Sequence, residues 1–142
     1  MLDAKKILSY VAFLLLISGC NDINLPPYIE KNVGEKISYT TNYISCFSAV
    51  YSLAPKSYDN ISSIISKKSE WKKTPVEKSI LDGMNTSSKI IYGGMQCNSG
   101  LGSHEKTFLE ATEGRNNDYI FLENSFILII EEKNILFVVS YS

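Results

Sequence analysis

The sequence predicts an all-β fold, a small antiparallel β-sandwich over residues 35–142 that follows a cleaved N-terminal segment and a short tether. Three runs of β-forming residues, 119–122, 125–130 and 135–141, follow one another in the last third of the chain. Turn-forming residues separate them. A fourth stretch, 37–50, is rich in Tyr, Thr, Ile and Val, which favour one or two further strands. Short strands separated by turn signals are typical of small β-sandwiches.

The first 19 residues have the organisation of a bacterial signal peptide. Lys5 and Lys6 form a basic start, and the apolar run 7–17 that follows is interrupted only by Ser9. This run is too short to span a bilayer, which needs about 20 residues, but it fits the hydrophobic core of a signal peptide. An ordinary signal peptide and a buried N-terminal helix are the alternatives.

The end of this run, Ile17-Ser18-Gly19-Cys20, resembles the lipobox of bacterial lipoproteins. The resemblance implies cleavage between Gly19 and Cys20, a thioether-linked diacylglycerol on the Cys20 sulfur and an amide-linked acyl chain on its new amine. Each buried CH₂ contributes about 0.8 kcal/mol, so three acyl chains hold a protein on a membrane more firmly than one. Asn21 follows the cysteine and Asp22 comes next. In bacterial lipoproteins, an aspartate directly after the cysteine retains the protein at the inner membrane. Because that position is Asn21 here, the resemblance favours an outer-membrane location facing the periplasm over the inner membrane.

The mature chain would begin at Cys20 and have 123 residues, which suits one domain. Without Asp3, Lys5 and Lys6, the 14 basic and 15 acidic residues become 12 and 14, a small negative net charge. A chain with no basic excess is not expected to bind nucleic acid. No later run has the length and apolar character of a transmembrane helix.

Two cysteines remain once Cys20 is lipidated, and an even pair in an exported protein predicts a disulfide. A Cys46–Cys97 bridge would close a loop of about 50 residues and, in the chain-entropy model, would stabilise the fold by roughly 4 kcal/mol. Two buried free thiols are the alternative. No metal site and no cofactor are expected, because His104 is the only histidine and the cysteines lack the spacing of a zinc ligand set.

Residues 20–34 are polar and contain Pro26-Pro27. Proline fixes φ and cannot donate to a strand ladder. We therefore expect an extended tether that begins at the lipidated cysteine and leads to the folded domain.

The stretch 59–73 is ambiguous between helix and strand. Ile61, Ile64 and Ile65 fit one face of a helix. Ile61, Ile65 and Trp71 also share the parity of one strand face. The strand is the favoured interpretation, although two or three apolar residues cannot decide the period.

Residues 74–88 contain a proline, a glycine and small polar side chains, and we expect them to cross from one sheet of the sandwich to the other. The following segment, 89–97, predicts a strand broken by a bulge at Gly93-Gly94. A loop over 98–104 completes this part of the chain.

Residues 126–130 are apolar at every position, which indicates a strand buried on both faces. Such a strand lies in the middle of a sheet that is covered on both sides, or is buried by a partner. Residues 131–134 then separate it from 135–141 at hairpin distance.

The chain carries no motif of a known catalytic site, and we expect a protein that is not an enzyme. His104-Glu105 does not continue as HExxH, because no second histidine follows. A Cys97–His104 nucleophile pair is conceivable, but it competes with the disulfide for Cys97. Glu131 and Glu132 are adjacent, so on a strand they would face opposite ways, and a solvated turn is the expected structure.

One stretch suggests a surface for a partner. The only tryptophan, Trp71, stands among Lys67, Lys68, Lys72 and Lys73. Tryptophan is enriched at binding hot spots, and lysines steer an acidic partner. Lys68, Trp71, Lys72 and Lys73 are therefore the candidate contact residues. The alternative is that Trp71 belongs to the core and the lysines form a solvated edge, which would discourage aggregation.

The order of features past the lipobox carries a resemblance to a known family. Leu25-Pro26-Pro27-Tyr28 follows the lipidated cysteine, and Cys46, a lysine-rich run ending at Trp71-Lys72-Lys73, Cys97 and a closing β-hairpin come after it. This order resembles the small periplasmic lipoproteins proposed as immunity proteins of type VI secretion systems. The resemblance implies an immunoglobulin-like sandwich that binds an injected toxin and blocks it. Such an inhibitor needs a complementary surface rather than reactive groups.

The resemblance implies that the partner is a cognate toxin. The lipid on Cys20 would hold the present protein at the membrane, where it would bind that toxin. A structural or accessory lipoprotein of an envelope or secretion assembly, for example a pilotin, is the main alternative. A hydrolase with an unrecognised site is a further one.

Overall fold

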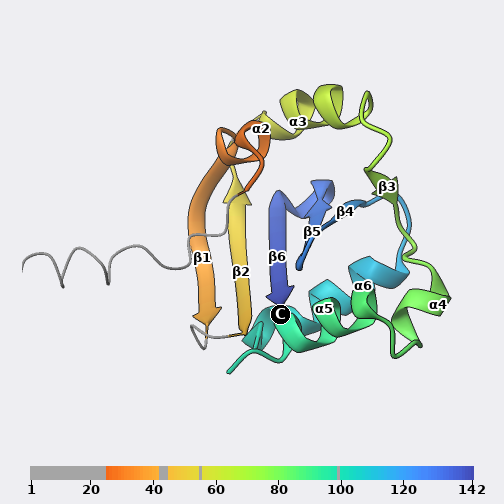
Figure 1. Cartoon of the computed structure of the whole chain (residues 1–142). Helices are drawn as coiled ribbons and strands as arrows, with labels where there is room; N and C mark the ends of the chain where they lie inside the picture. Colours follow the sequence, from red (N-terminus) through yellow and green to blue (C-terminus); the bar gives the residue numbers. More distant parts are fainter. Residues whose placement is uncertain (1–24, 42–44, 55, 99) are drawn as a thin grey trace, which may run out of the picture.

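The computed structural model describes residues 25–41, 45–54, 56–98 and 100–142, so Cys20 and the cleavage site after Gly19 lie outside the described residues. Six strands form one antiparallel sheet in the order β1-β2-β6-β5-β4-β3 (Figure 1). The strands are β1 (Val33–Thr41), β2 (Cys46–Leu53), β3 (Lys72–Lys73), β4 (Asp118–Leu122), β5 (Ser125–Ile130) and β6 (Ile135–Tyr141). The helices are α2 (Pro27–Glu30), α3 (Ser57–Ile65), α4 (Lys78–Leu81), α5 (Thr86–Met95) and α6 (Glu105–Glu113), with 3₁₀ turns η1 (Gly102–His104) and η2 (Glu131–Lys133).

The C-terminal third confirms the prediction of a strand buried on both faces. β5 lies between β6 and β4, and its side chains alternate between two hydrophobic cores. Phe126 and Leu128 enter one core, whereas Ile127 and Ile129 enter the other, and all four are fully buried. The hairpin to β6 turns through η2, as its spacing predicts. The Tyr- and Val-rich stretch 37–50 likewise contributes to two strands, β1 and β2.

The predicted two-sheet sandwich is not what the described residues form. They contain a single antiparallel sheet, with helices where the second sheet was expected. α5 and α6 pack on one face of the sheet, and α2 and α3 pack on the other (Figure 1). Residues 74–88 were expected to connect two sheets. They instead follow β3, pass through α4 and connect one face of the single sheet to the other.

The segment predicted as a bulged strand over 89–97 is instead part of a helix, α5. Asn85 caps its start, because the side-chain oxygen accepts a hydrogen bond from the Ser88 backbone N–H at 2.8 Å. Ile90, Ile91 and Met95 then recur on one helical face and are buried against the sheet. The strand prediction failed because a short apolar run followed by two glycines resembles a bulged strand as well as a helix.

The two glycines of α5 serve close packing rather than a bulge. A Cβ on Gly94 would lie 2.6 Å from the backbone nitrogen of Ser140 in β6. A Cβ on Gly93 would instead collide with the ring of Tyr141, which is 39% exposed at the end of the chain. Gly94 therefore sets how closely α5 approaches the sheet.

The helical alternative is correct for residues 59–65, which lie in α3, whereas 72–73 form the short strand β3. Ile61 and Ile65 are one turn apart in α3 and are 0% and 4% exposed. Trp71 shares their core but is reached through the turn residues 66–70, beyond the end of the helix. Equal parity with Trp71 was therefore a coincidence and not the signature of one strand face.

The predicted tether joins the folded domain earlier than expected. Pro27 begins α2, where its missing N–H costs nothing. Ile29 is fully buried, and Leu25 and Tyr28 pack against the same core. The folded domain thus includes the residues from Leu25 on.

Gly94→Ala should lower the free energy of unfolding by about 1–3 kcal/mol, because the new methyl group meets backbone that cannot move aside. This loss should outweigh the gain of about 1 kcal/mol in helix propensity. Gly93→Ala is the comparison variant and should cost less, since it meets the exposed side chain of Tyr141, which a change in its χ1 angle can move, rather than backbone. Urea unfolding of both variants measures the difference, and equal stabilities would contradict the close-approach role of Gly94.

Candidate functional site: a lysine-lined groove

A surface hollow of about 530 Å³ lies between the end of α3 and β3, and it contains the candidate contact residues. Its lining consists of Ser62, Ile65, Ser66, Lys67, Lys68, Ser69, Trp71, Lys72, Lys73 and Asp118. We name this hollow the lysine groove. Its four lysines are exposed, whereas Ile65, Trp71 and Asp118 are buried beneath them. The fold therefore gathers residues of one sequence run around a single concavity.

Trp71 supports the groove from below and is not an exposed hot spot. The side chain is 9% exposed and belongs to the core on the α2 and α3 side. Its indole Nε1–H donates a hydrogen bond to the Tyr28 hydroxyl at 2.9 Å. Trp71 thereby joins α2 to the segment that leads into β3. The alternative that Trp71 is a core residue describes the structure better than the hot-spot prediction.

The lysines of the groove are not equivalent. Lys73 Nζ lies 2.8 Å from Asp118 Oδ1, and the Asp118 side chain is only 7% exposed. Lys72 pairs with Glu77 at 3.5 Å, but both side chains are more than half exposed, and such pairs contribute little. Lys68 Nζ sits 5.1 Å from the centre of the Tyr28 ring, a cation–π contact that leaves its charge uncancelled. The charge of Lys73 is thus largely balanced, and that of Lys68 is not.

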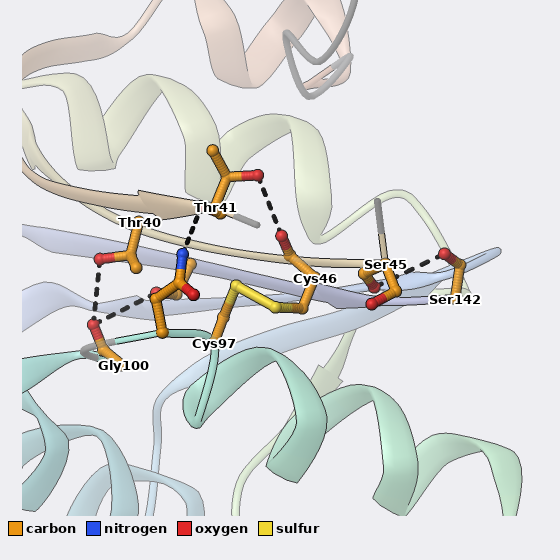
Figure 2. The surroundings of a disulfide bond; sticks show 9 residues. Thr40, Thr41, Ser45, Cys46, Cys97, Gly100 and Ser142 are labelled. Carbon is orange, nitrogen blue, oxygen red and sulfur yellow. Dashed lines mark hydrogen bonds between the residues drawn. A yellow bond between two sulfur atoms is a disulfide. The ribbon is translucent and has the colours of Figure 1, made fainter. Parts of the chain in front are cut away.

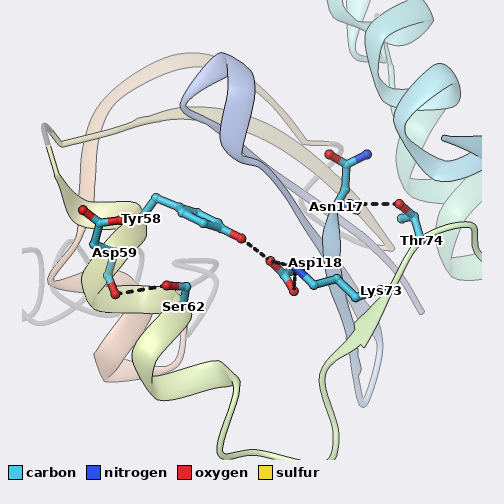
Figure 3. A network of polar contacts seen from close by, with 7 residues as sticks. All are labelled: Tyr58, Asp59, Ser62, Lys73, Thr74, Asn117 and Asp118. Atoms are coloured by element: carbon cyan, nitrogen blue, oxygen red, sulfur yellow. Dashed lines mark hydrogen bonds and ion pairs between the residues drawn. The ribbon is translucent and has the colours of Figure 1, made fainter. Parts of the chain in front are cut away.

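Asp118 is the junction of the site (Figure 3). Its Oδ2 accepts hydrogen bonds from the Tyr58 hydroxyl at 2.7 Å and from Lys73 Nζ at 2.9 Å. One carboxylate therefore ties α3 and β3 to β4. Next to it, the Thr74 N–H donates to the Asn117 carbonyl at 2.9 Å, and the Asn117 N–H donates to Thr74 Oγ1 at 3.1 Å.

Sequence reasoning missed Tyr58 and Asp118. They lie 60 residues apart and meet only because α3 packs across β4. Neither residue type is unusual in its place, since a tyrosine in a helix and an aspartate at the start of a strand are both ordinary. Only the observation that Asp118 begins a β-rich run whose other residues are apolar could have singled it out.

The predicted Cys46–Cys97 disulfide is present (Figure 2). It joins the start of β2 to the loop that follows α5 across a sequence separation of 51 residues, with Cα atoms 5.5 Å apart. The hydroxyls of Thr40 and Ser48 both donate to the Gly100 carbonyl, at 3.3 and 3.4 Å, which fastens the same loop to the sheet. A loop of this length corresponds to roughly 4 kcal/mol of stabilisation in the chain-entropy model.

The remaining candidate residues do not assemble into a reactive site. Cys97 is bonded to Cys46, so it is not a thiolate for His104 to activate. The His104 ring instead lies edge-on to Phe137, with centroids 6.5 Å apart. Glu131 and Glu132 are exposed in η2, which agrees with the predicted solvated turn. Across the described ranges, no three His, Cys, Asp or Glu side chains converge as metal ligands.

Two further hollows flank other parts of the sheet. One, of about 270 Å³, lies between α6 and η2 and is lined by both acidic and basic side chains. The other, of about 670 Å³, surrounds the disulfide and includes Tyr92, Gln96 and Tyr141. Neither concentrates charge of one sign as the lysine groove does. No helix in the described part of the chain is long and apolar enough to cross a membrane.

Comparison with protein-family models, with curated proteins and with solved structures finds no match to this chain.

Tyr58→Phe tests the Asp118 junction through its pH dependence. Burial first, and then the hydrogen bond to Asp118 and the charges of Asp118 and Glu131, raise the pKa of Tyr58 well above its ordinary value of 10.0. The folded state therefore favours the neutral phenol, and this contribution is complete below about pH 10 and is lost as pH rises above it. Urea unfolding from about pH 9 to about pH 11 should show a steeper loss of stability in wild type than in the variant. Equal slopes would contradict the coupling.

Proposed function

We propose that the protein is an exported lipoprotein, anchored in the cell envelope through Cys20 and facing the periplasm, that acts as a non-catalytic binding protein. Its partner is a type VI secretion toxin, which it neutralises by stoichiometric binding as an immunity protein. The outer membrane is favoured over the inner membrane. The observation that carries the binding role is the lysine groove, a concave surface with unbalanced positive charge on a chain of small negative net charge.

The disulfide supports the exported location. Disulfides persist in oxidising compartments such as the periplasm and are rare in the cytosol. Cys46 and Cys97 are bonded, which leaves Cys20 as the single cysteine available for lipid. The bridge also stiffens the domain, and a rigid surface loses less entropy when it binds.

Stoichiometric inhibition does not require the immunoglobulin-like sandwich that the family resemblance implies. A sheet buried on both faces presents an equally fixed set of surface residues. The groove itself is held by Asp118 and Trp71, whose contacts join three separate elements. Its shape therefore does not depend on a second sheet.

Cys20→Ser should abolish acylation and release the protein from the membrane fraction, because the thioether-linked lipid needs the cysteine sulfur. Metabolic labelling with an alkyne-tagged fatty acid measures the modification, and fractionation measures the location. The double variant Cys46→Ala/Cys97→Ala is the control and should still be labelled. Label that persists in Cys20→Ser would refute the lipobox assignment.

Cells that lack the protein should be killed when they grow in contact with the parent strain, and wild-type protein should restore survival. Lys67→Glu/Lys68→Glu should fail to protect, because reversing two charges in the groove should weaken partner binding by roughly tenfold or more. Lys89→Glu/Lys106→Glu, which makes the same charge change on the opposite face of the sheet, should protect fully. Survival is counted after co-culture, and the partner is identified by co-purification and mass spectrometry.

Survival of the deletion strain beside its parent would contradict the immunity role. Co-purification of envelope or secretion assembly components, in place of a toxin, would favour the alternative of a structural or accessory lipoprotein.

A further inference from the structure

We infer that the lysine groove takes an acidic segment of the partner protein in which carboxylates flank one apolar side chain, and that Lys67 and Lys68 bind its charge. This inference rests on the proposed function, because it describes the chemistry of the surface through which the partner is bound.

The distribution of charge selects the residues. Lys73 is held by the buried Asp118 carboxylate, and Lys72 has Glu77 beside it. Among the described residues, no carboxylate forms an ion pair with Lys67 or Lys68. Their ammonium groups are therefore the ones whose charge an incoming carboxylate can neutralise. Lysine binds as a point charge, so the site favours carboxylates without demanding one geometry.

The shape of the groove selects a segment with an apolar centre. Beneath the lysines lie Ile65 and Trp71, which are 4% and 9% exposed and belong to the same core. Burying a further apolar side chain against them would remove its surface from water at about 25 cal/mol per Å². A protruding side chain can enter the concavity, whereas the flat headgroup plane of a bilayer cannot. The groove thus fits a polypeptide better than a membrane.

Hydroxyl groups along the wall can hold the backbone of such a segment. Ser66 Oγ donates its proton to the Ser63 carbonyl at 3.2 Å, and Ser62 Oγ donates to the Asp59 carbonyl at 3.1 Å. Each oxygen therefore keeps its lone pairs to accept a hydrogen bond from an incoming backbone N–H. Ser62 lies in α3 and Ser66 directly follows the helix, and both line the groove together with the exposed lysines.

The floor of the groove is fixed before anything binds. The Trp71–Tyr28 hydrogen bond holds the indole, and Asp118 holds Lys73 and Tyr58 (Figure 3). Lys73 is accordingly a positioning residue, and Lys67 and Lys68 are the contact residues. A preformed site of this kind loses little entropy on binding.

Three synthetic peptides test the inference on the mature chain, residues 20–142 with Cys20→Ser. The first is Asp-Glu-Leu-Glu-Asp, the second replaces its acids by Asn and Gln, and the third replaces Leu by Ala. Calorimetry measures affinity, and emission from Trp71, the only tryptophan, reports whether binding occurs at the groove.

We expect the acidic peptide to bind and to change Trp71 emission. The amide peptide should bind about tenfold more weakly, and the Ala peptide several-fold more weakly. Lys67→Glu/Lys68→Glu should lower the affinity for the acidic peptide about tenfold or more, while Lys89→Glu/Lys106→Glu should leave that affinity unchanged.

Equal affinity of the acidic and amide peptides would overturn the inference, as would binding that the two lysine-pair variants weaken equally. Binding to phosphatidylglycerol vesicles in preference to every peptide would assign the groove to the membrane and would also overturn it. Protection of the deletion strain by the wild-type protein would be untouched by any of these results, so the inference and the proposed function fail separately.

Discussion

The fold depends on one strand that cannot face water on either side. β5 places an apolar side chain at each position from Phe126 to Ile130, so its two faces need separate cores and its two edges need neighbouring strands. On one face Phe126 and Phe137 pack around Phe108 of α6. Their ring centroids lie 6.0 and 5.3 Å from the centroid of the Phe108 ring. On the other face the core includes residues of α2 and α3. The layered arrangement of helix, sheet and helix follows from this requirement.

The sequence predicts most of the sheet because strand signals are local there. Alternation, β-branched content and turn spacing place β4, β5 and β6 within a residue or so of where they lie. The helices are harder to predict because each short apolar run is compatible with two periods. Ile61 and Ile65 satisfy both, and what decides between them is the distant sheet that the helix covers. Gly93 and Gly94 mislead for a related reason, since their small size serves a contact with β6 that no local pattern encodes.

The candidate site likewise contains residues that the local sequence points to and residues that only the fold brings together. Its lysines and Trp71 lie close together in sequence, and the disulfide is predicted by counting cysteines in a chain that carries a predicted export signal. The contacts that shape the groove come from elsewhere: Tyr28 from the expected tether, Tyr58 from α3 and Asp118 from β4. These residues become recognisable only when the topology brings their elements together. The role of Trp71 changes for the same reason, because its burial depends on α2 folding back over it.

Protection of a sheet edge explains some of the lysines but not all of them. β3 is one of the two edge strands and is only two residues long, and lysines on such a strand discourage pairing with another molecule. Edge protection accounts for Lys72 and Lys73, which form the strand, and for Pro75, which cannot extend it. It gives no reason for Lys67 and Lys68, which lie in the turn after α3 and carry charge that no described carboxylate pairs with. The proposed binding role therefore rests on Lys67 and Lys68, and not on the lysines nearest to the tryptophan.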